Sequence, residues 1–316
     1  MRIGGIGTLR LLLASVGVLL LAAAPGRAET EAEGVADVAR GEYLVRAAGC
    51  ISCHTDKVQK GAFLAGGRAL ESPYGTFYSS NITPDAETGI GAWSDTDFIH
   101  ALRHGESPTG RTYYPAFPYA SYSAMQRADM LDIKAYLFAQ APVYQENRGH
   151  ELRFPFSWRF SIYPWRWLFF LATSPDVTKN SESSAAERGR YLVDVLGHCA
   201  ECHTPRNIAG GLKRGAPLAG TRYGPNGGSV PNITPDSQTG IGDWSIADLV
   251  FFFQTGLKPD GDDVQGHMRE TIEDGLRHLS VEDLTAIAVH LKALPPIRRA
   301  VRPTGQHSPT THYDDW

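Results

Sequence analysis

The feature that most constrains this chain is a five-residue motif, Cys-x-x-Cys-His, which occurs twice. The two copies, Cys50–His54 and Cys199–His203, contain all 4 cysteines of the 316-residue sequence. This spacing is typical of c-type haem attachment, in which two thiols bond to the haem vinyl groups and the histidine binds the iron. We therefore predict two covalently bound haem c groups. Their predicted anchors are the thiols of Cys50, Cys53, Cys199 and Cys202 and the imidazoles of His54 and His203.

Paired cysteines have other uses, which remain alternatives. A disulfide needs no histidine directly after its second cysteine. A tetrahedral zinc site could use all four cysteines, but both histidines and the similar sequences around the motifs would then have no role. A thioredoxin-like site requires a compact strand–helix unit, whereas these motifs are flanked by a predicted helix and a glycine-rich loop. Haem attachment is therefore the favoured interpretation.

The first 28 residues have the pattern of a cleaved export signal. Arg2 and Arg10 supply a positive start, residues 11–24 are apolar, and Gly26 and Ala28 are small residues near the cleavage position. The apolar run is short for a membrane-spanning helix, and no other stretch is long enough to cross a bilayer. Cleavage would remove three arginines and no acids, which changes the formal net charge from −4 to −7. We therefore expect a periplasmic protein and exclude nucleic acid as a partner.

The sequences around the two motifs are also duplicated, which identifies an internal repeat. The segment Arg40–Cys50 matches Arg188–Cys199 with one inserted residue, and Asn81–Ser94 matches Asn232–Ser245. The repeat predicts two domains joined by a linker. The predicted boundaries are residues 1–28 for the signal, 35–145 for domain 1, 146–185 for the linker, 186–297 for domain 2 and 298–316 for a flexible tail.

Each domain is predicted to be all-α. We expect a helix before the motif, a short helix after a long loop, and a last amphipathic helix near residues 126–140 or 280–293. Gly41 and Gly189 would let the first helix of each domain approach the last helix closely. Helix starts of the Ser-x-x-acid type are predicted at Ser94, Ser245 and Ser280.

With these motifs the chain resembles class I cytochromes c. It is most similar to the cytochrome c subunits of bacterial membrane-bound dehydrogenases for alcohols, gluconate, fructose or nicotinate. The segments that carry the resemblance are the Arg-Gly-x-Tyr-Leu-Val stretch before each motif, His198–Asn207, Tyr114–Tyr119 and Gly266–Met268. The resemblance spans residues 35–297 and implies two tandem class I cytochrome c domains joined by an aromatic-rich linker. Many of these subunits have three haem units, whereas this chain has two motifs.

The resemblance also implies a methionine as the sixth iron ligand, on the loop before the last helix. Met268 lies in such a glycine-bearing loop of domain 2. In domain 1 the usual methionine position holds Phe117, so we favour Met125, which precedes the last helix, over Met130, which aligns with a core position. An open or differently ligated first iron remains the alternative.

The residues around each iron follow from the same resemblance. Class I cytochromes c fix the histidine ring by a hydrogen bond to a backbone carbonyl in the loop after the motif, and the matching carbonyls are those of Phe63 and Pro217. Trp93 and Trp244 are expected near the haem edges. A purely structural role of the two tryptophans in the local core is the alternative.

The predicted linker is unusually aromatic and is unlike a flexible linker in composition. Arg153, Arg159 and Arg166 interrupt the stretch from 154 to 170, so it cannot span a membrane as a simple helix. We expect it to pack between the domains and to fix the separation of the haems. A docking surface for a dehydrogenase or for the membrane interface is the alternative.

The predicted function is electron transfer, with no catalytic residue in this chain. Electrons would come from a periplasmic flavin-, quinone- or molybdenum-dependent dehydrogenase and pass to a quinone, another cytochrome or an oxidase of the respiratory chain. Peripheral membrane association is compatible with this role. The alternative is a dihaem redox enzyme, such as a thiosulfate dehydrogenase or a peroxidase, which needs an iron with an open position. This alternative stays open because Phe117 occupies the position of the usual methionine ligand in domain 1.

The motifs predict that the mature protein carries two haems that survive acid–acetone extraction, and that its intact mass contains two added haems. A variant with Cys50→Ala and Cys53→Ala should keep one haem, because both thioether bonds of the first motif are lost. Two haems remaining in that variant would contradict the attachment sites.

Overall fold

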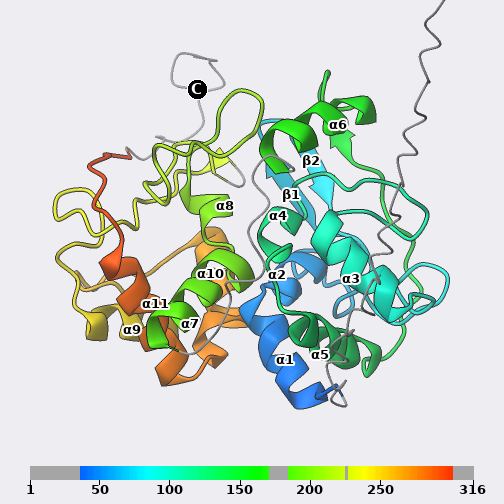
Figure 1. Ribbon diagram of the computed structural model, residues 1–316, viewed down its shortest axis with the longest axis horizontal. Helices are drawn as coiled ribbons and strands as arrows, with labels where there is room; N and C mark the ends of the chain where they lie inside the picture. Colours follow the sequence, from blue (N-terminus) through cyan, green and yellow to red (C-terminus); the bar gives the residue numbers. More distant parts are fainter. Residues whose placement is uncertain (1–35, 171–183, 225–226, 302–316) are drawn as a thin grey trace, which may run out of the picture. The chain divides into compact units, whose positions relative to one another are not determined.

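The computed structural model describes residues 36–170, 184–224 and 227–301 (Figure 1). The predicted signal at 1–28 lies outside the described residues, as do part of the predicted linker and the tail from residue 302. No helix in these described ranges combines the length and the hydropathy that crossing a bilayer requires.

The described part of each half of the chain has the same order of helices. The first half contains α1 (Val38–Ala47), α2 (Cys50–His54), α3 (Asp95–His104), α4 (Tyr119–Tyr122) and α5 (Arg127–Phe138). The second half contains α7 (Ala185–Arg190), a π-helical continuation (Tyr191–Leu196), α8 (Ala200–His203), α9 (Ile246–Thr255), α10 (Gly266–Asp274), a 3-10 turn (Leu276–His278) and α11 (Val281–Ala293). The repeat in the sequence is therefore a repeat in structure.

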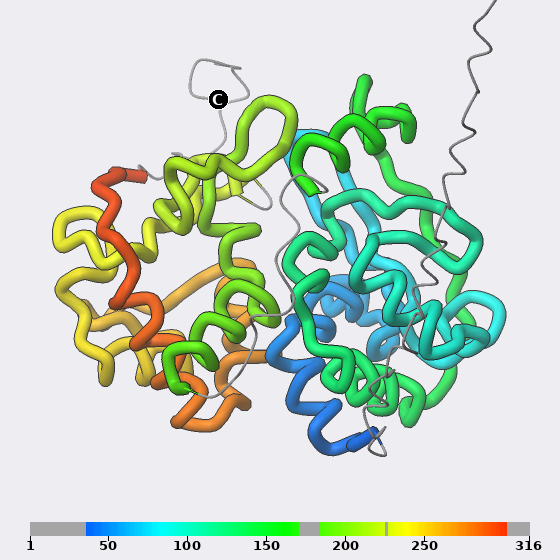
Figure 2. The backbone as a smooth tube through the Cα atoms, viewed as in Figure 1, coloured from blue at the N-terminus to red at the C-terminus, as the bar shows by residue number. Residues whose placement is uncertain are grey.

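The all-α prediction is wrong in one respect, because the first half also contains a small antiparallel sheet. Its strands are β1 (Ala69–Ser72), β2 (Gly75–Tyr78) and β3 (Glu151–Leu152), in the order β1–β2–β3. Strand β3 lies in the predicted linker, so the start of that segment is built onto the first half (Figure 2). The strands are too short to show the apolar alternation that identifies a strand in a sequence.

The predicted helix starts are confirmed. The hydroxyls of Ser94 and Ser245 accept from the N–H three residues later, and the aspartate at that position accepts from the serine N–H in return. Ser280 accepts from the N–H of Asp283 at 3.1 Å. These side chains satisfy N–H groups that have no partner inside their helices.

The predicted close approach of the first and last helices is also confirmed. A Cβ on Gly41 would lie 2.0 Å from the carbonyl oxygen of Asp132 in α5, and a Cβ on Gly189 would lie 2.1 Å from that of Ala286 in α11. No real side chain tolerates such a contact, so only glycine allows α1 to pack on α5 and α7 to pack on α11.

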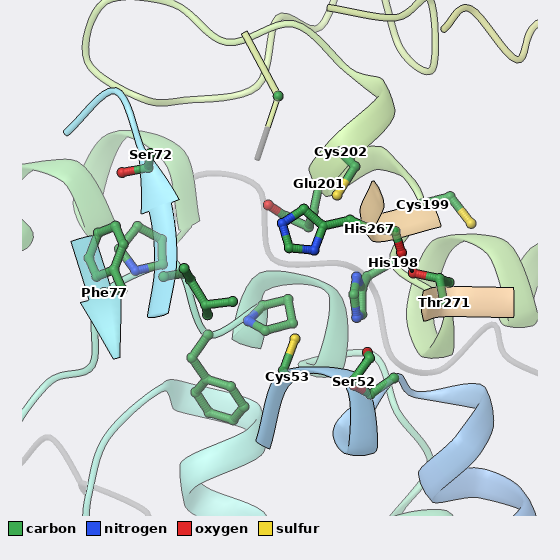
Figure 3. A pocket seen from close by; sticks show the side chains of 18 of the residues that line it. Ser52, Cys53, Ser72, Phe77, His198, Cys199, Glu201, Cys202, His267 and Thr271 are labelled. Atoms are coloured by element: carbon green, nitrogen blue, oxygen red, sulfur yellow. Dashed lines mark hydrogen bonds between the residues drawn. The ribbon is translucent and has the colours of Figure 1, made fainter. Parts of the chain in front are cut away.

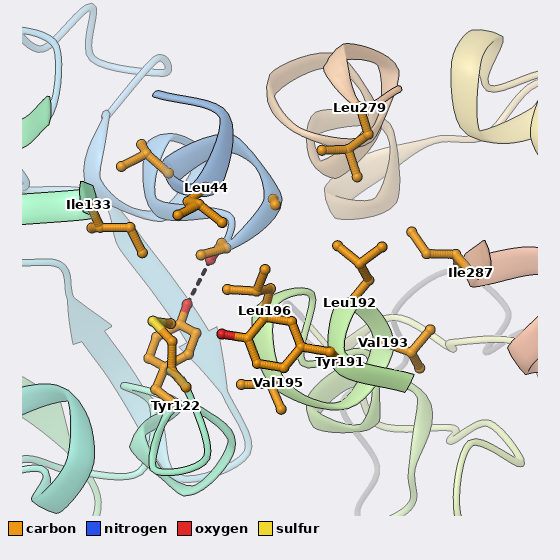
Figure 4. Close-up of a cluster of buried hydrophobic side chains, with 14 of the residues drawn as sticks. Leu44, Tyr122, Ile133, Tyr191, Leu192, Val193, Val195, Leu196, Leu279 and Ile287 are labelled. Carbon is orange, nitrogen blue, oxygen red and sulfur yellow. Dashed lines mark hydrogen bonds between the residues drawn. The ribbon is translucent and has the colours of Figure 1, made fainter. Parts of the chain in front are cut away.

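The two halves share one hydrophobic core (Figure 4). Leu44 and Ile133 from the first half belong to the same buried cluster as Leu192, Leu196 and Leu279 from the second half. Because the cluster is continuous, neither half has an interior that is closed off from the other, and folding of one half supports folding of the other.

Two equivalent tyrosines cross between the halves in opposite directions. Tyr43 donates to Asp283 Oδ2 at 2.6 Å, and Tyr191 donates to Asp129 Oδ2 at 2.6 Å. Each tyrosine oxygen also accepts from the backbone N–H before the other half's last helix, at 3.1 Å in both cases. The halves therefore exchange the same contacts, as the two subunits of a twofold dimer do.

The same aspartates pair with an arginine of their own half. Arg188 donates to Asp283 through Nε at 2.9 Å and Nη2 at 2.7 Å, and Arg40 forms an ion pair with Asp129. Burial alone would raise the pKa of Asp283, but the hydrogen bonds from Arg188 and Tyr43 lower it. Each residue type of the Arg-Gly-x-Tyr stretch thus has its own role. The arginine pairs with an aspartate of its own half, the glycine lets the first helix approach the last helix, and the tyrosine bonds to the other half.

The aromatic segment contacts both halves. It contains a 3-10 turn (Arg159–Ser161), α6 (Ile162–Trp165) and a π-helical turn (Arg166–Phe170). In the first half, Arg166 donates to the His104 carbonyl at 2.5 Å and to Glu106 at 2.9 Å. In the second half, Phe169 lies so close to Gly211 that a Cβ there would be 2.4 Å from the ring.

Candidate functional site

A cavity of about 1720 Å³ is lined by residues of both Cys-x-x-Cys-His motifs. Figure 3 shows Cys53 from α2 on one side and Cys199 and Cys202 from α8 on the other, with His198 and His267 between them. Pockets for ordinary small ligands have volumes of roughly 300–1,000 Å³. This cavity is therefore large enough for more than one such ligand.

Each motif forms a single helical turn, which places its reactive side chains together. Gly49 precedes α2 with φ 67°, and His198 precedes α8 with φ 36°. Residues three and four apart on a helix share a face, so Cys50, Cys53 and His54 all reach the same cavity. The second motif repeats this arrangement from α8.

The structure corrects the predicted partners of the two histidine rings. His54 Nδ1 donates to the Ser80 carbonyl at 2.6 Å, and His203 Nδ1 donates to the Pro231 carbonyl at 2.8 Å. Because a carbonyl only accepts, the proton is on Nδ1 and the lone pair of Nε2 is available to a metal. The prediction of the Phe63 and Pro217 carbonyls is wrong.

The sequence did contain a signal for the correct carbonyls. Ser80 and Pro231 directly precede the duplicated Asn-Ile-Thr-Pro-Asp stretch. The asparagine of each copy holds the loop in place: Asn81 donates to the Val143 carbonyl at 2.8 Å, and Asn232 donates to that of Ile297 at 2.7 Å. The repeated asparagines therefore hold the loop whose carbonyl, that of Ser80 or Pro231, orients the histidine ring.

The structure separates the two candidate methionines of the first half. Met125 and Met130 are both 0 % exposed, but only Met125 is among the residues that line the cavity. Met268 also lines the cavity. It lies in the first turn of α10 and not in a loop as predicted, so its position depends on how that helix is held.

Backbone hydrogen bonds show that Phe117 and Met268 are equivalent positions. The N–H of Tyr113 donates to the Gly105 carbonyl at 2.7 Å, and that of Val264 donates to the Gly256 carbonyl at 2.9 Å. Phe117 and Met268 each follow four residues later, and both line the cavity. The first half thus has an aromatic ring where the second has a thioether.

The two tryptophans line the cavity and also belong to the local core, the two positions considered from the sequence. Trp93 and Trp244 line the cavity and also pack against the shared hydrophobic core. Trp244 stacks edge-to-face on Phe252 with ring centroids 5.4 Å apart. They form part of the apolar wall that any occupant of the cavity would contact.

The two motifs lie against each other at His198, which sequence reasoning did not assign to the site. A Cβ on Gly49 would be 3.7 Å from His198 Nε2, and the rings of His198 and Tyr122 have centroids 5.6 Å apart. Tyr122 in turn donates to the Ala48 carbonyl at 2.6 Å. This contact joins distant parts of the chain, so sequence spacing could not reveal it.

Burial favours the neutral form of the cysteine thiols. Burial raises the pKa of Cys50, Cys199 and Cys202 to about 12, so these thiols stay neutral. All four cysteines are free thiols. Across the described ranges, no three His, Cys, Asp or Glu side chains gather as a metal site requires. A zinc site built on the four cysteines is therefore not supported.

Comparison with known proteins agrees with this geometry. Residues 38–139 match the cytochrome c family model. The chain is 40 % identical over 265 residues to a dihaem cytochrome c-type protein of Cereibacter sphaeroides, with 83 % of this chain and 87 % of that protein aligned. The chain belongs to the cytochrome c family.

Dehydrogenase subunits are among the relatives of this cytochrome. The gluconate 2-dehydrogenase cytochrome c subunit of Pantoea cypripedii is 43 % identical over 81 % of this chain and 59 % of its own length. The fructose dehydrogenase cytochrome subunit of Gluconobacter japonicus is 41 % identical over 82 % of this chain and 52 % of its own length. This cytochrome therefore spans little more than half the length of these two subunits.

The residues present fit covalent haem. Each motif presents two thiols and an imidazole whose Nε2 is free, and the wall around them is rich in apolar and aromatic side chains. Covalent haem c in this family is held by such thiols, and the iron supplies one-electron redox chemistry. The thiols and imidazoles of the two motifs would hold the haems, and the fold would set their spacing.

The two methionines of the first half provide a matched test. Met125→Ala should remove a far-red thioether–iron absorption band and lower one midpoint potential, because a thioether favours ferrous iron. Met130→Ala removes an equally buried side chain away from the cavity, so it should cost about 2–5 kcal/mol of stability without changing either spectrum. Identical spectra in the wild type and the Met125→Ala variant would assign Met125 to packing alone.

Proposed function

We propose that this protein is a periplasmic dihaem electron carrier, which receives electrons from a partner dehydrogenase and delivers them to the respiratory chain. The observation that carries the proposal is that both haem-attachment motifs line one cavity and lie against each other at His198 and Gly49. Electron transfer requires only close approach of redox centres. A shared cavity supplies that approach inside one chain.

The proposed architecture is two tandem class I cytochrome c domains, at 35–145 and 186–297, joined by the aromatic linker. Residues 1–28 would be a cleaved signal, and residues 298–316 a flexible tail. The proposed iron ligands are His54 with Met125 in the first domain and His203 with Met268 in the second. Support comes from the free Nε2 of each histidine and the position of each methionine on the cavity wall.

The proposed electron donor is a flavin-, quinone- or molybdenum-dependent dehydrogenase. The relatives include cytochrome subunits of gluconate, fructose, alcohol and nicotinate dehydrogenases, which support a partner of this kind. The proposed acceptor is a quinone, another cytochrome or an oxidase. In this proposal the organic substrate is bound by the partner dehydrogenase.

One observation favours a second candidate function. Phe117 stands where the second half has Met268, so the first iron depends on Met125 for a sixth ligand. A first iron without that ligand would have an open position, as a thiosulfate dehydrogenase or a peroxidase needs. The buried position of Met125 on the cavity wall supports the carrier over the enzyme.

An exposed aromatic surface supports peripheral membrane association. Phe154, Trp158, Phe160, Tyr163 and Trp167 are between 58 % and 75 % exposed. The stretch from 153 to 170 contains no acid, and of its three arginines Arg153 is exposed, Arg159 is partly exposed and Arg166 is buried and paired with Glu106. Aromatic rings with interspersed arginines suit the interface of a bilayer with anionic headgroups.

The membrane proposal predicts sedimentation with anionic lipid vesicles. Burying one such side chain contributes about 1.5–3 kcal/mol, so Trp158→Ser with Trp167→Ser should lower the partition coefficient at least about tenfold. Phe251→Ser, which removes an exposed ring on α9, is the matched control and should bind like the wild type. Equal binding by the double variant and the wild type would exclude this surface as the membrane contact.

The carrier proposal predicts slow binding of carbon monoxide and cyanide, because both irons have protein ligands on both sides. The purified protein should be reduced rapidly by its dehydrogenase and should turn over neither thiosulfate nor peroxide alone. Stopped-flow absorbance measures both properties. Rapid ligand binding together with turnover in the absence of a partner would overturn the carrier proposal in favour of the enzyme.

A further inference from the structure

Arg68 belongs to the first half but is bonded to a helix of the second. Its Nη1 donates to the Ser52 carbonyl at 2.5 Å, inside the first haem-attachment motif. Its Nη2 lies 3.0 Å from His267 Nδ1 and forms an ion pair with Glu270. Both partners are on α10, one residue before and two residues after Met268. The Arg68 side chain is 8 % exposed, so little water competes for these bonds.

The other end of α10 is also attached to the first half. Lys57 forms an ion pair with Asp274, the last residue of the helix. Arg46 Nη1 lies 3.5 Å from the Asp274 carbonyl, and the Arg46 carbonyl lies 2.7 Å from where a Cβ on Gly275 would be. The first half therefore holds this helix at both ends.

The attachment of α10 to its own half consists of packing against α9 and the 3-10 turn that follows it. Ile272 is the buried residue of this nine-residue helix. The ion pairs of Arg269 with Asp263 and Glu273 lie on its exposed side. The tilt of α10, and with it the direction of the Met268 side chain, thus depends on the polar contacts made by the first half as well as on packing within its own half.

The two halves differ at this point. Arg222 is the equivalent of Arg68. Arg68 lies four residues after Leu64 and Arg222 lies four residues after Leu218, and both leucines have φ 58°. Arg68 lines the cavity, whereas Arg222 is not among the described residues that do. This difference provides a matched control, because the same substitution can be made at both positions.

We propose that Arg68 is a positioning residue for Met268, so that the first half of the chain controls the ligation of the second iron. The proposal rests on the ligand assignment of Met268 given above. A ligating atom must be held within about 0.5 Å of its productive position. Arg68 does this by connecting the backbone of the first motif to α10 on both sides of Met268.

The test is Arg68→Gln in the haem-loaded, full-length protein, compared with Met268→Ala. Both variants should keep two covalent haems by intact mass. Both should lose the same thioether–iron band, and the same one of the two midpoint potentials should shift downward in a spectroelectrochemical titration. The other iron should keep its thioether–iron band, because Arg68 does not hold Met125. Its potential should shift less, since the change there is only the loss of a charge bonded to the Ser52 carbonyl.

Three further variants complete the design. Glu270→Gln removes the ion pair from a partly exposed position and should weaken the same band even if Arg68→Gln fails to fold. Arg68→Lys keeps the charge and should retain part of the band, whereas Arg222→Gln should leave spectrum and potentials unchanged. If Met268→Ala removes the band but Arg68→Gln and Glu270→Gln both keep it, the positioning role of Arg68 is overturned. If Met268→Ala itself changes nothing, the ligand assignment is wrong, and the proposal falls with it.

Discussion

The structure depends on the close contact between the first and last helices of each half. Gly41 and Gly189 bring these helices together at a distance that no side chain would allow. Two residues later, Tyr43 and Tyr191 reach the aspartates of the opposite half. The same short stretch therefore closes each half and joins the two halves. Because the joint is hydrogen-bonded and partly buried, it holds the two attachment motifs at a fixed separation.

The large cavity explains why so small a core is sufficient. A domain of about a hundred residues buries only a modest interior of its own. Here the walls of both halves face one hollow of about 1720 Å³ that is lined by the thiols of all four cysteines. An apolar macrocycle attached to each motif would complete this interior. Electron transfer and stability then have the same structural basis, since the groups that carry electrons also fill the core.

The repeat is symmetrical in its framework and asymmetrical at the positions proposed to surround the irons. Both halves contain the serine–aspartate caps and the asparagine that holds the loop before the histidine's carbonyl partner. Both also contain the tyrosine that donates to an aspartate of the other half, at 2.6 Å in each case. The halves differ at Phe117 and Met268 and at Arg68 and Arg222. Duplicated halves keep the contacts that the joint requires, whereas positions that face only the cavity can diverge. Such divergence would give two irons in one chain different surroundings and hence different potentials.

The sequence by itself revealed the repeat, the helix starts and the close glycine contacts, and it predicted the covalent chemistry, because each leaves a short motif or a duplicated stretch in the chain. The prediction missed the carbonyls of Ser80 and Pro231, which reach the histidines from 26 and 28 residues away, although the duplicated stretch after them marks both positions. It missed strands too short to show a pattern. The helical position of Met268 and its connection to Arg68, 200 residues earlier, were decided only by the tertiary structure. Such contacts come from the packing of two halves, and chain spacing carries no information about them.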